Sequence, residues 1–133
     1  MAILLDYSQI VFGQVFTDLK RNGSTISIDL VRHLVLNQIA SYNNRFRNKY
    51  GQMVICIDSR RGYWRRNAFE YYKWKRSQDR DDSDIDWAEL FKDMNQIRDE
   101  VIEQVPLLTY EVDKYEADDL IAALVREFRD EKH

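Results

Sequence analysis

Three short apolar runs, each followed by acidic residues, constrain the fold of this chain more than any other feature. The runs cover residues 2–5, 53–57 and 107–112. Runs with little polar alternation are typical of strands buried on both faces of a parallel sheet. The segments between them are long enough for helices, and right-handed crossovers would then place all three strands in one sheet. We therefore expect an α/β fold, a three-layer parallel sheet with helices on both faces.

Helical periodicity fills the segments between and after these runs. We expect helices over residues 7–19, 27–50, 87–105 and 116–129. Ser27 is a plausible N-cap for the second of these helices, and Gly51 ends it. In the last helix, Ala117, Leu120 and Leu124 belong to a one-sided apolar stripe, which predicts that one face is buried.

Acidic residues stand at or just after the end of every predicted strand. Asp6 follows the first, Asp58 the second, and Glu116 with Asp118 follow the third. Because the carboxyl ends of parallel strands meet at one edge, all four carboxylates should lie close together there. The alternative for Glu116 and Asp118 is that they only complement the helix macrodipole, which contributes about 0.3–1 kcal/mol each. By helical phase, Asp119 points nearly opposite the buried stripe.

Converging carboxylates need a compensating cation. Two of them about 5 Å apart repel by roughly 3 kcal/mol at an effective dielectric constant of about 20. Oxygen ligands at a water-accessible sheet edge favour Mg²⁺ or Mn²⁺ over zinc. A natural use of such a site is metal-assisted phosphodiester hydrolysis.

Charge is segregated along the chain although the net charge is only −3. Residues 60–76 contain seven basic residues and one acid, whereas residues 79–86 contain five aspartates and one arginine. The basic segment is expected to be helical over residues 63–76. It also interleaves aromatic side chains, which favours nucleic-acid binding through phosphate contacts and base stacking. The alternative is an amphipathic helix with buried aromatics and a solvated basic face. The candidate nucleic-acid-binding residues are Tyr63, Trp64, Arg65, Arg66, Tyr72, Lys73, Lys75 and Arg76.

Other features exclude several classes of protein. No apolar run approaches the length of a membrane span, and no signal-peptide pattern is present, which favours a cytoplasmic protein without membrane contact. The one cysteine, Cys56, lies in an apolar run and is expected to be a packed thiol. His33 and His133 have no metal-ligand spacing, so a zinc site is not expected.

Several motifs resemble the flap endonuclease family of 5′ nucleases, in particular its T-even bacteriophage ribonuclease H type. They are Cys56-Ile57-Asp58, Gly62-Tyr63-Trp64-Arg65-Arg66, Tyr71-Tyr72-Lys73 and Asp113-Lys114-Tyr115-Glu116-Ala117-Asp118-Asp119. The resemblance runs from the first predicted strand through the last helix. It implies a Mg²⁺-dependent enzyme that removes RNA primers and 5′ flaps from DNA and RNA–DNA hybrids during replication, in the cytoplasm of a phage-infected bacterial cell.

Roles for single residues follow from the same resemblance. Asp6, Asp58, Glu116 and Asp118 would bind the first metal ion directly or through water, and Asp119, which matches a further family acid, is a fifth candidate metal residue. Arg65 and Lys73 would contact the scissile phosphate, with Asp118 as the third catalytic residue. Residues 59–86 would form the arch or gateway helix and its loop.

The chain departs from the family pattern after this last helix. Family members continue with a strand, further acids that complete a second metal site, and a duplex-binding motif, none of which is found within residues 1–133. We therefore interpret the chain as the N-terminal portion of one 5′-nuclease catalytic domain, with an incomplete sheet, weak activity at best and no second domain. An edge strand left unpaired is expected to pair with a separate C-terminal half or with another copy.

Three alternatives stay open at this point. A phosphoacceptor receiver domain shares the length and a strand-end aspartate such as Asp58, but it normally needs paired acids after its first strand. A compact PIN-type ribonuclease shares the strand-end acids. The third alternative keeps the ancestry and drops catalysis, leaving a half-protein that only binds nucleic acid or a partner.

Overall fold

The computed structural model describes residues 2–22, 27–60, 62, 64 and 87–130. The elements follow the order that the apolar runs predict. They are β1 (Ala2–Asp6), α1 (Tyr7–Asn22), α2 (Ile28–Tyr50), β2 (Gln52–Ile57), α5 (Trp87–Gln104), β3 (Leu108–Glu111) and α6 (Ala117–Asp130). The predicted helix over 63–76 and the Asp-rich loop that follows it lie outside the described residues.

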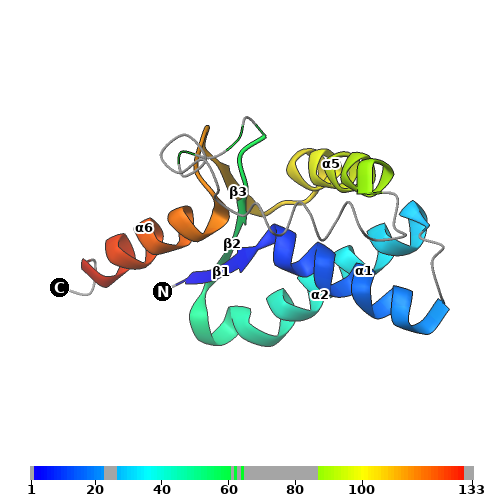
Figure 1. Ribbon diagram of the computed structural model, residues 1–133. Coiled ribbons are helices and arrows are strands. Elements are labelled where there is room, and N and C mark those ends of the chain that lie inside the picture. Colours follow the sequence, from blue (N-terminus) through cyan, green and yellow to red (C-terminus); the bar gives the residue numbers. More distant parts are fainter. Residues whose placement is uncertain (1, 23–26, 61, 63, 65–86, 131–133) are drawn as a thin grey trace.

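The three strands form one parallel sheet in the order β1-β2-β3 (Figure 1). Asp6 pairs with Cys56, and Cys56 in turn pairs with Tyr110. This register places the ends of all three strands at one edge. The predicted α/β class and parallel sheet are confirmed.

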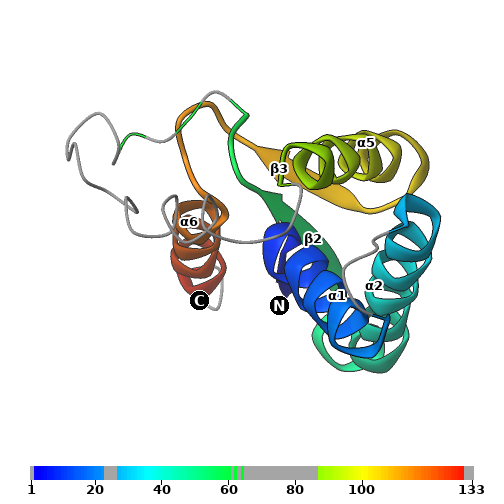
Figure 2. The same cartoon turned by 45° about the vertical axis from the view of Figure 1, so that its right-hand side comes forward.

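The sheet lies between two layers of helices, with α1, α2 and α5 on one side and α6 on the other (Figure 2). Alternate residues of β2 pack against these two layers. Met53, Ile55 and Ile57 pack in the larger core, which is completed by α1, α2 and α5. Val54 and Cys56 face the other way and pack with Ala117 and its neighbours on α6. The sheet is therefore the middle of three layers, with most of the buried apolar surface on the side of α1, α2 and α5.

Only β2 is buried on both faces, whereas all three strands were expected to be. β1 is half-buried throughout, and β3 alternates, with Leu108 46% and Tyr110 43% exposed. The reason is position in the sheet. Within the described residues, β1 and β3 each have a neighbouring strand on one side only, so part of their surface faces solvent.

Local signals place the ends of α2 as the sequence predicts. Ser27 stands at the N-cap in an extended conformation, and Gly51 takes a positive φ of 88° beyond the last turn, where its N–H donates to the carbonyl of Arg47. A positive φ is strained for residues with a Cβ, which explains glycine at this position.

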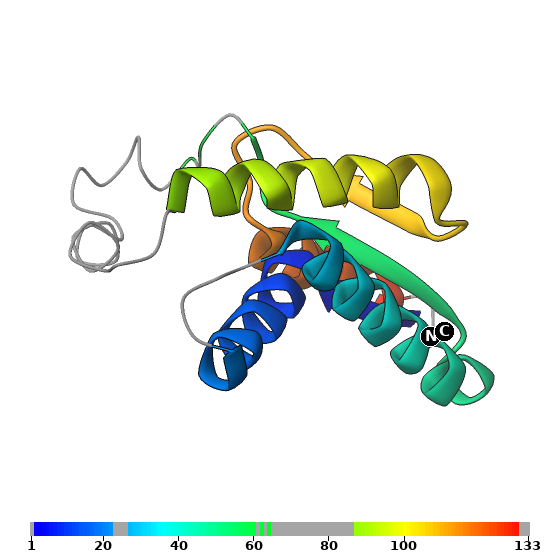
Figure 3. The same cartoon turned by 90° about the vertical axis from the view of Figure 1, so that its right-hand side faces the viewer.

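Helix α5 lies across one side of the molecule next to α1 and α2 (Figure 3). Its apolar face contributes Ile97 and Val101 to the larger core. At the surface, Arg32 of α2 forms a bidentate ion pair with Glu100 of α5. The Arg32 Nε and Nη2 atoms lie 2.6 and 3.0 Å from the two carboxylate oxygens of Glu100. In the described part of the chain, no helix combines the length and apolar character needed to cross a membrane.

Candidate active site

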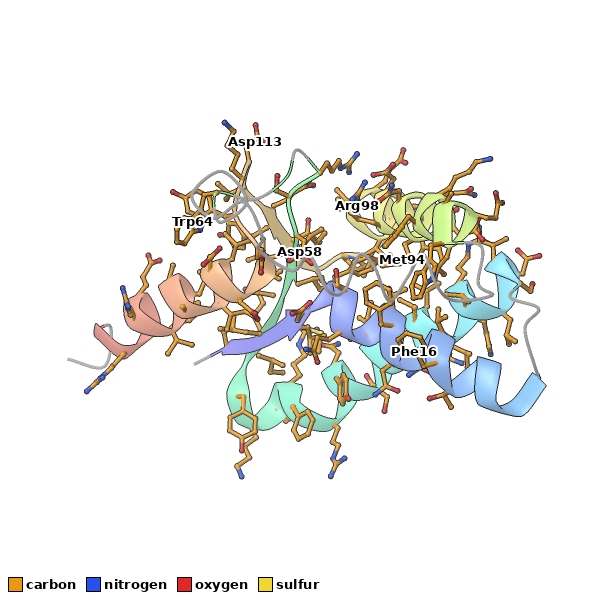
Figure 4. The ribbon with its side chains drawn as sticks, in the orientation of Figure 1. Phe16, Asp58, Trp64, Met94, Arg98 and Asp113 are labelled. Carbon is orange, nitrogen blue, oxygen red and sulfur yellow. The ribbon has the colours of Figure 1, made fainter. Side chains whose placement is uncertain are left out.

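Asp58, at the end of β2, connects two other parts of the carboxyl edge. Its Oδ2 accepts a hydrogen bond from the Ser8 hydroxyl at 2.8 Å, and its Oδ1 accepts one from the backbone N–H of Ala117 at 2.6 Å. Ser8 lies in the first turn of α1, and Ala117 is the first residue of α6. One carboxylate therefore ties the β1–α1 junction to the start of α6. Figure 4 shows Asp58 at this central position.

Asp6 is the last residue of β1 and stands directly before α1. Its Oδ1 accepts a hydrogen bond from the backbone N–H of Gln9 at 3.2 Å, the usual contact of an N-cap side chain. Burial raises the pKa of the Asp6 carboxyl, and the negative charges of Asp58 and Asp118 raise it further, against the lowering effect of the Gln9 N–H. Asp58 and Asp118 therefore lie near enough to act electrostatically on Asp6, as acids gathered at one edge should.

The acids that follow β3 differ in exposure. Glu116, directly before α6, is only 3% exposed, whereas Asp118 is exposed to solvent. Helical phase predicted that both would flank the buried stripe. Glu116 lies deeper because the N-terminus of α6 abuts Asp58 through the Ala117 N–H. We call Asp6, Asp58, Glu116 and Asp118 together the acidic edge.

Asp119 turns back toward the beginning of its own helix. Its Oδ2 accepts a hydrogen bond from the backbone N–H of Glu116 at 3.0 Å and another from the Trp64 indole N–H at 3.2 Å. An acid at this position that binds the N-cap N–H is half of a capping box. Asp119 is therefore less exposed than Asp118, although helical phase placed it opposite the buried stripe.

The chain leaving β2 is hydrogen-bonded to the chain leaving β3. The Ser59 N–H donates to the Tyr115 carbonyl at 3.0 Å, and the Lys114 N–H donates to the Ser59 hydroxyl oxygen at 2.9 Å. Further along, the Trp64 N–H donates to the Lys114 carbonyl at 2.7 Å. We call these contacts of Ser59 and Trp64 with residues 114–119 the loop clasp. The loop clasp holds Ser59 and Trp64 beside the acidic edge.

Metal binding was predicted for Asp6, Asp58, Glu116, Asp118 and Asp119. Across residues 2–22, 27–60, 62, 64 and 87–130, no three acidic, histidine or cysteine side chains are grouped so that they could hold one metal ion. The chemistry of the acidic edge nevertheless fits a hard divalent cation, because it supplies carboxylate oxygens whose charges already raise the pKa of Asp6. Three of the side chains also accept hydrogen bonds from backbone N–H groups: Asp6 from Gln9, Asp58 from Ala117 and Asp119 from Glu116.

Trp64 is the one predicted nucleic-acid-binding residue that the structure describes. Its side chain is 41% exposed beside the start of α6 (Figure 4). The other predicted residues lie outside the described part of the chain. They are Tyr63, Arg65, Arg66, Tyr72, Lys73, Lys75 and Arg76.

Sequence reasoning missed several side chains that support the edge. Ser8 and Ser59 were overlooked because a single serine after a strand carries no distinctive signal. Arg98 could have been found, since it places a charge inside the apolar stripe of α5. Its side chain is buried, and its charge opposes the rise that burial causes in the pKa of Tyr7, whose hydroxyl donates to the Met94 carbonyl at 3.0 Å.

Comparisons with known proteins agree with this architecture. The family model described as 5′-3′ exonuclease, N-terminal resolvase-like domain, matches residues 1–133. Ribonuclease H of Enterobacteria phage T4 is 37% identical to the chain over 132 residues, which cover 98% of this chain and 43% of the phage protein. The chain thus spans less than half the length of that relative. The match also decides against the receiver-domain alternative.

Proposed function

Because this chain belongs to the family of 5′-3′ exonuclease N-terminal, resolvase-like domains, a family of nucleases, we propose that it is the N-terminal part of a metal-dependent 5′ nuclease. Its substrates would be DNA and RNA–DNA hybrids with a 5′ end or flap, and the reaction would remove RNA primers and flaps during replication. The cell compartment would be the cytoplasm of a phage-infected bacterium. The observation that carries this proposal is that Asp58 joins the β1–α1 junction to the start of α6 at the carboxyl edge of a parallel sheet, where the charges of Asp58 and Asp118 act on Asp6.

In this proposal the acidic edge holds one Mg²⁺ or Mn²⁺ ion through Asp6, Asp58, Glu116 and Asp118. Such an ion would polarise a phosphate and lower the pKa of an attacking water. The chain's own contribution is to keep the acids in place. Ser8 and the Ala117 N–H orient Asp58, while the Gln9 N–H orients Asp6. Asp119 is assigned to the support of α6, because its carboxylate turns back to the Glu116 N–H at the beginning of its own helix and to the Trp64 indole N–H.

Substrate binding is proposed for the segment that begins in the loop clasp. Residues 59–86 would form an arch through which a 5′ end passes, with Arg65 and Lys73 on the scissile phosphate. Trp64 supports this assignment, because its ring is substantially exposed next to the acidic edge and could stack on an unpaired base. The closeness of Trp64 to Asp119 would bring bound nucleic acid to the carboxylates.

Cleavage of a 5′-labelled flap in Mg²⁺ tests the proposal. We expect weak cleavage by the chain, which spans less than half of its phage relative, and loss of that cleavage in Asp118→Asn. The matched control is Glu103→Gln, which removes a charge from an exposed position of α5 and should leave cleavage unchanged. Cleavage that persists in Asp118→Asn would contradict the metal role of the acidic edge.

A second candidate function is binding of nucleic acid or a partner without catalysis. It is favoured by the finding that, among the described residues, no three acidic, histidine or cysteine side chains are grouped so that they could hold one metal ion. Thermal unfolding with and without Mg²⁺ separates the two candidates. A metal present at ten times its Kd would stabilise the fold by about 1.4 kcal/mol. We expect Mg²⁺ to stabilise the native chain by this amount, EDTA to reverse the gain, and Asp118→Asn to show no gain. A chain that binds the flap oligonucleotide but is not stabilised by Mg²⁺ would favour the second candidate.

A further inference from the structure

We infer that Asp119 is a positioning residue that holds Trp64 against the start of α6, beside the acidic edge. The inference rests on the proposed nuclease function, because its purpose is to aim a substrate-binding segment at the carboxylates. It differs from the metal-binding role that the sequence predicted for Asp119.

The first observation is that a single oxygen of Asp119 accepts hydrogen bonds from both the start of α6 and Trp64. Oδ2 accepts the Glu116 backbone N–H at 3.0 Å and the Trp64 indole N–H at 3.2 Å. Glu116, whose N–H takes part in this contact, and Asp118, the residue before Asp119, both belong to the acidic edge. The position of the indole is therefore set by the same helix turn that sets the position of the two acids.

The second observation is that Trp64 is held at two points. Its backbone N–H donates to the Lys114 carbonyl at 2.7 Å, while its indole N–H binds Asp119. One contact alone would let the residue rotate, but a main-chain contact and a side-chain contact together define its orientation. Lys114 itself adopts a positive φ of 68°, which is uncommon for a residue with a side chain, and its N–H is bound by the Ser59 hydroxyl. The turn that receives Trp64 is thus itself held in place.

The third observation is that Trp64 lies outside the packed core. The residue is 41% exposed and belongs to neither cluster of the described core. A polar contact through the indole N–H is what joins it to α6. Arg65, a proposed phosphate-binding residue, follows it directly in the sequence. Fixing Trp64 therefore fixes the point from which that segment starts.

Hydrogen exchange of the tryptophan indole N–H groups tests the hydrogen bond between Trp64 and Asp119. The chain has three tryptophans, Trp64, Trp74 and Trp87, and Trp64→Phe identifies the Trp64 signal in an NMR spectrum. We expect its indole N–H to exchange about fivefold faster in Asp119→Ala, as expected for loss of a hydrogen bond of ordinary strength. Asp119→Asn keeps an acceptor oxygen and should keep the protection. Equal exchange in the native chain and in Asp119→Ala would overturn the inference.

Binding of a fluorescent 5′-flap oligonucleotide, in buffer with EDTA so that metal ligation cannot contribute, tests the consequence. Asp119→Ala and Asp119→Asn both remove one negative charge, so they form a charge-matched pair. We expect Asp119→Ala and Trp64→Phe to raise Kd about threefold to tenfold, as loss of a contact worth about 1 kcal/mol does. Asp119→Asn should leave Kd unchanged. The double variant Asp119→Ala, Trp64→Phe should bind no worse than Asp119→Ala.

Three results have distinct meanings. Equal weakening by Asp119→Asn and Asp119→Ala would show that the charge matters and would overturn the positioning role. Loss of indole protection without any change in Kd would also overturn it. Trp64→Phe leaves the cap of α6 intact, so an effect of that variant cannot be ascribed to fraying of the helix. If the native chain does not bind the oligonucleotide, the proposed function fails, which is seen before any variant is compared.

Discussion

At the scale of single residues, the edge is built from side chains that each join segments far apart in the sequence. Asp58 contacts Ser8 and Ala117, which lie 50 and 59 positions away. Behind it in β2, Cys56 is fully buried against Ala117 and α6. Burial raises the pKa of the Cys56 thiol to about 11, and the charge of Asp6 contributes to the rise.

The thiol of Cys56 should make stability fall at alkaline pH. An acid whose pKa is raised by folding stays protonated in the native state while it ionises in the unfolded state, so stability is lost as pH rises from 9.0 to about 11. A rise of this size corresponds to about 3 kcal/mol. Urea unfolding of the native chain and of Cys56→Ala from pH 8 to 11 measures the difference. Tyrosine and lysine side chains titrate in both proteins, so their effect cancels in the comparison. If the free energy of unfolding depends on pH equally in both proteins, the prediction is wrong.

At the scale of elements, the two faces of the sheet are covered unequally. Helices α1, α2 and α5 enclose the larger core on one face of the sheet. On the other face, α6 packs against a small cluster around Val54 and Cys56. Ile97 places α5 in the larger core, where it is 0% exposed, whereas Ile102 on the same helix is 40% exposed. These two isoleucines make the packing of α5 testable with one type of substitution.

Truncation of these isoleucines should have very different effects. Ile97→Ala should lower the free energy of unfolding by about 2–5 kcal/mol, because it leaves a cavity in a packed core. Ile102→Ala should change it by less than about 0.5 kcal/mol, as expected for an exposed site. Urea unfolding followed by circular dichroism measures both. Similar losses in the two variants would show that α5 does not pack through Ile97.

At the scale of the whole molecule, the sheet is open at both sides within the described residues. β1 and β3 each pair with β2 only, and Leu108 and Tyr110 of β3 are largely exposed. An unpaired edge offers N–H and C=O groups to another strand. We propose that such an edge pairs with a separate C-terminal half or with a second copy of this chain.

Light scattering during size-exclusion chromatography tests the association of the chain alone. We expect a mass above that of the 16.0 kDa monomer at high protein concentration. Tyr110→Lys should shift the equilibrium toward monomer, because it places a charge on β3. Val125→Lys adds the same charge at an exposed site on α6 and should have no such effect. A stable monomer at every concentration would contradict self-association and leave the separate half as the partner to be tested.

The sequence by itself determined the order of the elements, the parallel sheet and the delivery of acids to one edge. Periodicity, the cap at Ser27 and the stop at Gly51 are local properties, and crossover handedness follows from chain chirality. The family resemblance through Asp58 and the segment 113–119 was also readable without coordinates, and it was confirmed.

Only the tertiary structure decided how each carboxylate is used. Helical phase could not show that Asp119 turns back to Glu116 and Trp64, or that Asp58 binds the start of α6. It also could not show that β1 and β3 are edges, since burial of a strand depends on its neighbours. The physical reason is sequence distance: Trp64 and Asp119 are 55 positions apart, and Asp58 and Ala117 are 59 apart. Local sequence preferences carry no information about contacts or strand pairings over such distances.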